Sequence, residues 1–241
     1  MSGHSKWSTI KRKKGAADAK RGAAFTRLSK DITLAAREGG GSVEMNPALR
    51  LAVKKAKSSN MPSANIDRAI KKGTGELPGI KYDDFEFEGY GPHSVAILIE
   101  VMTDNKNRTL PEIRSIMAKN GGNLGESGCV NWIFLKKAIF TIQIDKITED
   151  HLMELLEDSN VEDIIFEEGF FEVIVPSDDF KIISDIFDKN SIEYDGEISL
   201  VPQNFVELES NQADKIIKLL ELIENHEDVQ KVHTNFKINQ L

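Results

Sequence analysis

The spacing of the apolar residues changes near residue 76, and this change separates two parts of the chain. Before it, apolar side chains recur every three or four residues, as at Phe25, Leu28, Ile32 and Ala35, which is the period of an amphipathic helix. After the linker TGELPG, stretches such as FEFEGY and VAILIEVM have the short, apolar and β-branched character of strands. The sequence therefore predicts a helical part followed by a larger part that mixes strands with helices.

Three helices are predicted in residues 1–76. The first covers 15–38 and ends at three consecutive glycines. Asn46 is a suitable N-cap for the second helix, because Pro47 follows it at the favoured first helical position. The third lies in PSANIDRAIKKG and stops at Gly73. Each helix has one apolar face, so the three predict a small bundle.

The two parts carry opposite charge. Residues 1–75 hold 17 lysines and arginines against five acidic residues, whereas the remainder holds 14 basic and 34 acidic residues. The whole chain has a formal net charge of -8. A division this sharp indicates two bodies with different partners, and the basic one has the charge of a phosphate-binding surface.

The candidate nucleic-acid-binding residues are the basic side chains of the predicted arm and of the polar helix faces, together with one tryptophan. Trp7 is equally consistent with stacking on a base and with anchoring the arm. Asn65 and Arg68 are candidate base readers on the third helix. The candidate set is Lys6, Trp7, Lys11, Arg12, Lys13, Lys14, Lys20, Arg21, Arg27, Lys30, Arg37, Arg50, Lys54, Lys57, Arg68, Lys71 and Lys72.

The acidic part is predicted to form two α/β domains, one inserted in the other. Residues 138–200 have the order β-α-β-β-α-β, which is the ferredoxin-like pattern and is complete in itself. The segments on either side then form the second domain. The predicted fold class is α+β and multidomain, with a three-helix bundle and two α/β sandwich domains. The predicted domain bounds are 1–76, 80–136 with 202–241, and 137–201 for the insertion.

No catalytic, metal or cofactor site is predicted. NGGNLGESG lacks the Lys-Ser/Thr ending of a phosphate loop and follows a helix instead of preceding one, so it reads as a structural turn. The five histidines lack metal-ligand spacing. Cys129, the single cysteine, is interpreted as a buried thiol and fits a reducing compartment. No apolar run approaches the ~20 residues needed to span a bilayer. A non-enzymatic cytoplasmic protein is therefore expected.

A second polar site is considered in TDNKNRT, which lies between a predicted strand and a predicted helix whose capping box is Thr109 with Glu112. Local hydrogen bonding of a turn explains Asp and Asn there. The functional alternative is a polar contact made by Asn105, Lys106 and Arg108.

Four long segments of the chain resemble the YebC/PmpR family. They are residues 1–41, NPALRLAVKKAKSSNMPSANIDRAIKKGTGE, GYGPHSVAILIEVMTDNKNRT and NGGNLGESGCVNWIF. The resemblance implies a three-domain architecture and a non-enzymatic role in gene expression. Lys106 stands where relatives more often have Arg, so a phosphate clamp in that loop loses a bidentate donor.

Three functions remain open. The first is a DNA-binding transcriptional regulator whose bundle grips duplex backbone. The second is a ribosome-associated translation factor that binds ribosomal RNA and relieves stalling at proline-rich sequences, as some relatives do. The third is a protein–protein adaptor that uses the acidic domains. The sequence does not decide between DNA and RNA, nor does it give the oligomeric state.

Overall fold

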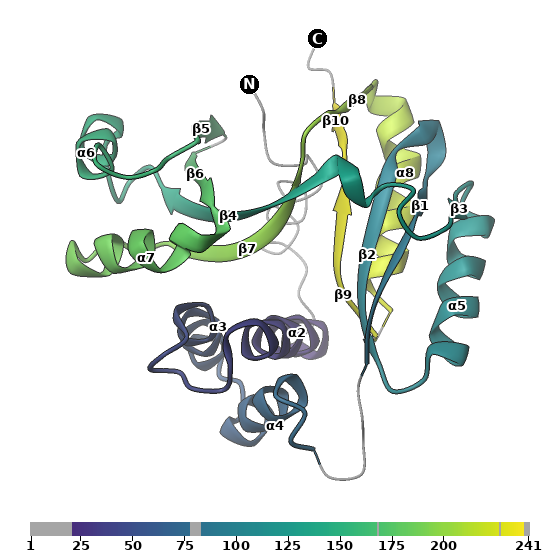
Figure 1. Cartoon of the computed structure of the whole chain (residues 1–241), viewed down its shortest axis with the longest axis horizontal. Helices are drawn as coiled ribbons and strands as arrows, with labels where there is room; N and C mark the ends of the chain where they lie inside the picture. The colour runs from purple at the N-terminus through teal and green to yellow at the C-terminus, as the bar shows by residue number, and fades with distance from the viewer. Residues whose placement is uncertain (1–20, 78–82, 168, 227, 239–241) are drawn as a thin grey trace.

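The computed structural model describes residues 21–77, 83–167, 169–226 and 228–238, with the backbone alone at 21–24, 27 and 167. These residues form a helical bundle and two four-stranded sheets, which lie around a common centre (Figure 1). The α+β fold class with an inserted ferredoxin-like domain is confirmed. None of the helices in the described ranges is long and apolar enough to cross a bilayer.

The bundle consists of α2 (Arg21–Gly39), α3 (Pro47–Ser58) and α4 (Ser63–Gly73). Leu28, Ile32 and Leu49 are among the apolar side chains buried between these helices. Asn46 caps α3 by accepting from the backbone N–H of Leu49, and its amide donates to the carbonyls of Ala35 and Gly40 near the end of α2. The predicted cap is thus confirmed, and it also ties the two helices together.

The first sheet has the strand order β3-β1-β2-β9 and is antiparallel throughout. Two helices cover one face, where Ile97, Ile99, Ile113 and Leu219 are fully buried. A short parallel pair of strands extends this body. The elements are β1 (Asp83–Tyr90), β2 (Ala96–Thr103), α5 (Lys106–Lys119), β3 (Asn123–Leu124), β8 (Val206–Leu208), α8 (Ser210–Glu224), β9 (Val229–Thr234) and β10 (Phe236–Ile238).

The second sheet is inserted between β3 and β8 and has the order β5-β6-β4-β7. All its pairs are antiparallel. Phe140 is buried against Phe180 and Phe187, with ring centroids 5.0 and 5.6 Å away. The elements are β4 (Phe134–Gln143), α6 (Glu149–Leu155), β5 (Asp163–Glu167), β6 (Phe170–Pro176), α7 (Phe180–Lys189) and β7 (Asp195–Pro202).

Three element predictions were wrong in detail. CVNWIF, predicted as a strand, contains the 3₁₀ turn Asn131–Ile133, and the strand begins only at Phe134. VQKVHTNFKI, predicted as one strand, forms both β9 and β10, which belong to different sheets. The helix predicted to start with a capping box at Thr109 starts at Lys106 and is capped by Asn105.

Candidate nucleic-acid interface

Part of the predicted binding set lies outside the described residues. This holds for Lys6, Trp7, Lys11, Arg12, Lys13, Lys14 and Lys20. For Arg21 and Arg27 the structure describes only the backbone, which belongs to α2. The interface that can be built from side chains therefore starts with Lys30.

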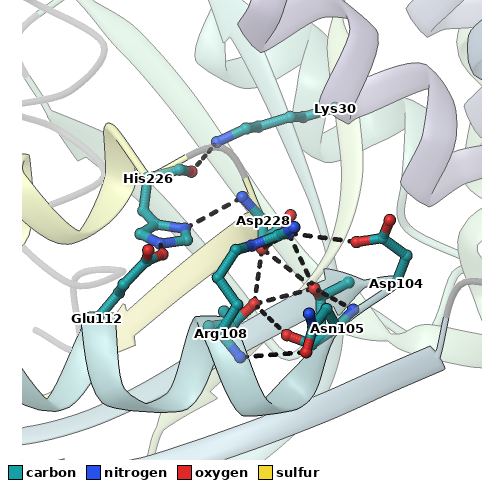
Figure 2. A network of polar contacts seen from close by, with 9 residues as sticks. Lys30, Asp104, Asn105, Arg108, Glu112, His226 and Asp228 are labelled. Carbon is teal, nitrogen blue, oxygen red and sulfur yellow. Dashed lines mark hydrogen bonds and ion pairs between the residues drawn. The ribbon is translucent and has the colours of Figure 1, made fainter.

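Lys30 contacts the end of α8 instead of facing solvent. Its Nζ donates to the carbonyl oxygen of Glu224 at 3.2 Å and to that of His226 at 2.8 Å, the contact drawn in Figure 2. A cation is favourable there because the carbonyls at a helix C-terminus carry partial negative charge. The predicted basic row of α2 thus begins, within the described side chains, with a lysine that joins the bundle to the first sheet.

Arg37 makes the second contact between the bundle and the first sheet. Its guanidinium lies 2.6 Å from Asp84 of β1 and 3.7 Å from Glu100 of β2. Glu100 also accepts from Nε2 of His233 at 2.7 Å. Burial by itself would raise the pKa of Glu100, but His233, Lys231 and Arg37 outweigh it and lower this pKa to about 2. Arg37 therefore belongs to a partly buried charge cluster between the bundle and the first sheet.

Two basic residues of α3 contact the second sheet and its helix. Arg50 lies 3.3 Å from Asp188 of α7, and Lys55 lies 3.3 Å from Asp195 of β7. Beside them, Leu51 packs against the apolar core of the second sheet. Arg50 is thus shared between the candidate surface and the contact between domains. Lys55, which is not in the predicted binding set, serves the same contact.

Four predicted residues remain on the outside of the bundle. Lys54 and Lys57 of α3 and Arg68 and Lys71 of α4 are exposed. Lys54 is near enough to Glu193 for its charge to help lower the pKa of that carboxyl. Each pair is spaced three residues apart, so its members lie on one side of their helix. Lys72 is half-buried. These four cations are the part of the predicted surface most available to phosphates.

The polar cluster after β2 is a structural network in the described residues. Asn105 accepts from the backbone N–H of Arg108 at 3.2 Å, and Lys106 Nζ lies 4.2 Å from the centre of the Phe85 ring. Arg108 donates to Asp228 at 2.7 Å and to Asp104 at 3.2 Å (Figure 2). The local hydrogen bonding weighed for this turn is therefore present, and Arg108 is already engaged.

Asp228 is the centre of that network and was not among the predicted site residues. It is buried and accepts from the hydroxyls of Thr103 and Thr109 at 3.1 and 2.6 Å as well as from Arg108. Burial would raise the pKa of Asp228, but the bonds from Thr109, Arg108 and Thr103 keep it below its ordinary value. Because Asp228 lies more than 100 residues from its partners in sequence, no local pattern could have indicated it.

The backbone of the glycine-rich turn binds the carboxylate of a residue of this chain, Glu88. The carboxylate of Glu88 accepts from the backbone N–H groups of Gly128, Val130 and Asn131 at 2.6, 2.7 and 2.8 Å. Although burial opposes it, these bonds lower the pKa of Glu88. The interpretation as a structural turn agrees with this geometry. It also explains why CVNWIF does not begin as a strand, since the backbone N–H groups of Val130 and Asn131 donate to Glu88 and not to a neighbouring strand.

Cys129, in the same turn, is half-buried. Burial and the charges of Glu88 and Glu126 raise the pKa of its thiol, which disfavours the nucleophilic thiolate. Among the described residues, no cluster of three or more His, Cys, Asp or Glu side chains has the arrangement of a metal site.

Comparison with known proteins finds the same architecture elsewhere. Residues 5–76 match the family model "TACO1/YebC protein N-terminal domain", and residues 82–236 match "TACO1/YebC second and third domain". A protein of Desulfotalea psychrophila is 52% identical over 242 residues, covering 100% of this chain and 97% of its own. One of Syntrophobacter fumaroxidans is 50% identical over 240 residues, covering 99% and 96%. Each is named a "Probable transcriptional regulatory protein".

A solved structure is also similar. The crystal structure of a conserved hypothetical protein from Aquifex aeolicus superposes with a TM-score of 0.80 at 37% identity, over 93% of both chains.

Proposed function

The chain belongs to the TACO1/YebC family, and on that premise we propose that it regulates gene expression by binding duplex DNA through its helical bundle, without catalysing a reaction. The names of the relatives support a regulatory role. The basic side chains of residues 1–20 belong to the same proposed surface.

The observation that carries this proposal is the outward position of Lys54, Lys57, Arg68 and Lys71. Other cations of the bundle are held by the acidic domains, but these four are exposed on two neighbouring helices. Exposed lysines and arginines attract phosphate, because binding releases the counterions condensed on the nucleic acid. Contacts of this kind fix the position of a protein on a duplex without specifying its sequence.

The salt dependence of binding tests the proposal. If six to eight basic residues contact phosphates, log affinity for a duplex falls with log salt at a slope of about −5 to −7. The variant Lys54→Glu with Lys57→Glu removes two of these contacts, so the slope flattens by about two units. Fluorescence anisotropy of a labelled duplex, at salt concentrations between about 50 and 200 mM, measures the slope for the unchanged protein and for the variant.

A matched control is available on α8. Lys215 and Lys218 are exposed and have the same three-residue spacing, so their change to Glu alters net charge equally and at the same local geometry. The proposed surface requires that this control keep the slope of the unchanged protein. If both variants flatten it alike, the attraction is a property of total charge and the bundle has no special role.

Ribosomal RNA is the second candidate target, and the small number of candidate base readers favours it. On α4 the candidate base readers are the exposed Asn65 and Arg68, and a grip on phosphates with little base readout suits a folded RNA. Crosslinking in cells, followed by sequencing of the bound RNA and DNA, separates the two. Enrichment of ribosomal RNA over promoters would assign the protein to translation.

A further inference from the structure

One edge of the first sheet is open along most of β1. On one side β1 pairs with β2 over its full length, but on the other side only Gly89 and Tyr90 pair, with β3. The carbonyl of Glu88 points to this second side, where it accepts from Gly125. Because backbone groups alternate along a strand, those of Asp84 and Glu86 point to the same side, where no described strand lies.

A groove of about 610 Å³ follows this open edge. On one side it is bounded by α5, from which Lys106, Leu110 and Arg114 line it at successive spacings of four residues. Phe85 and Phe87 line the same side and belong to the core beneath α5. An edge strand beside a helix is the arrangement in which extended peptides add to a sheet as a further strand.

The two sides of the groove differ in charge. On the face away from α5, Asp84 and Glu86 are exposed, and Glu100 lies directly across from Glu86 in the ladder. Arg37 balances part of this charge through its contact with Asp84. On the α5 side the lining is mainly apolar, with Lys106 and Arg114 exposed.

We propose that the open edge of β1 binds an extended segment of a partner protein in which basic and apolar side chains alternate. The partner's backbone would pair with Asp84 and Glu86, its basic side chains would face Glu86, and its apolar side chains would lie beside Phe85 under α5. This pattern follows from the two-residue period of a strand. The surface is separate from the exposed cations of α3 and α4, so it provides a second binding function.

Charge also decides against two other occupants. Nucleic acid is disfavoured because its phosphates would approach the carboxylates of Asp84 and Glu86. A second copy of this chain is disfavoured because antiparallel pairing of β1 with itself would bring acidic side chains of both copies together, and like charges at cross-strand positions repel.

The test uses the full-length protein and the synthetic peptide acetyl-(Lys-Val)4-amide. Hydrogen–deuterium exchange is expected to show slower exchange in residues 83–88 when the peptide is added. The variant Glu86→Lys is expected to weaken binding by tenfold or more. Its matched control is Asp214→Lys, an exposed residue of α8 that undergoes the same change of charge and is expected to bind within twofold of the unchanged protein.

A second peptide, acetyl-(Lys-Lys-Val-Val)2-amide, has the same composition without the alternation and is expected to bind at least tenfold more weakly. Equal binding of the two peptides, or equal loss in Glu86→Lys and Asp214→Lys, would overturn the proposal by reducing it to general attraction. Protection confined to other segments would also overturn it. Protection of 83–88 that grows with protein concentration alone would assign the edge to self-association instead.

Discussion

At the scale of single residues, the surroundings of Glu100 lower its pKa to about 2. It lies on β2 between His233 and Lys231 of the neighbouring strand and Arg37 of the bundle. Lys231 donates in turn to the carbonyl of Ile198 and contacts Glu197 of β7. Burial favours the neutral amine, but the carboxylates of Glu197, Glu100 and Glu38 raise the pKa of Lys231. Glu100 thus belongs to a charge cluster shared by the bundle and both sheets.

Acid should destabilise the protein through Glu100. Its pKa is about 2 in the folded state against an ordinary value of 4.5, so the folded state binds fewer protons in this window. Stability from this group is complete above pH 4.5 and is lost as the pH falls towards 2, by on the order of 3 kcal/mol. Urea unfolding across this pH range is expected to show a smaller pH dependence in Glu100→Gln. The exposed Glu154→Gln should leave it unchanged, and an equal effect of both would contradict the assignment.

Cys129 should react slowly with alkylating reagents. Because burial, Glu88 and Glu126 raise the pKa of its thiol, the thiolate fraction near pH 8 is lower than that of a free cysteine. The rate of alkylation by iodoacetamide, followed by mass spectrometry, should therefore rise with a midpoint above that of glutathione. Glu126→Gln should shift this midpoint downward, and a midpoint below that of glutathione would contradict the expected direction.

At the scale of elements, the start of α5 shows how precisely a local sequence pattern can predict where a helix begins. Thr109 and Glu112 have the spacing of a capping box, yet Asn105 caps the helix and Thr109 lies one turn inside it, donating to Asp228. The sequence could indicate a polar helix start in TDNKNRT because Asn and Asp are typical caps. It could not choose between candidates four residues apart, because the choice depends on Asp228, which lies just before β9 and far away in sequence.

The cap itself gives a prediction. Asn105→Ala removes the acceptor for the backbone N–H of Arg108, and loss of such a cap costs about 1 kcal/mol. Asn107 is an exposed residue inside the same helix, where Ala is the better helix former by about 0.5 kcal/mol. Asn105→Ala should therefore lower, and Asn107→Ala slightly raise, the free energy of unfolding in urea. A loss in both variants would show that the effect is not due to capping.

At the scale of the whole molecule, the bundle is held to the rest of the chain by charge and by apolar contact together. Periodicity correctly predicted the three helices, their core and the ferredoxin-like insertion, since each depends on residues near one another in sequence. It gave no information on what each polar face contacts. Lys30 and Arg37 were therefore expected to bind nucleic acid, whereas the acidic domains hold both.

The apolar part of this contact should dominate. Leu51 of α3 packs on the core of the second sheet, and such burial is worth about 1.5–3 kcal/mol for a full side chain. The neighbouring ion pair of Lys55 and Asp195 is exposed and is of the kind that contributes little. Small-angle scattering should show that Leu51→Asp enlarges the radius of gyration, whereas Lys55→Glu leaves it nearly unchanged. Expansion in Lys55→Glu alone would reverse this ranking.

The paired strands β4 and β7 have a mechanical consequence. The chain enters the inserted sheet through β4 and leaves it through β7, and the two strands are paired without interruption from Phe134 with Pro202 to Thr141 with Asp195 (Figure 1). A double-stranded ribbon resists bending and torsion far better than two separate linkers, so a force on one sheet is transmitted to the other. The two sheets therefore act as a single stiff arm. The bundle is held against this arm at two places, by Lys30 and Arg37 on the first sheet and by Arg50 and Leu51 on the second.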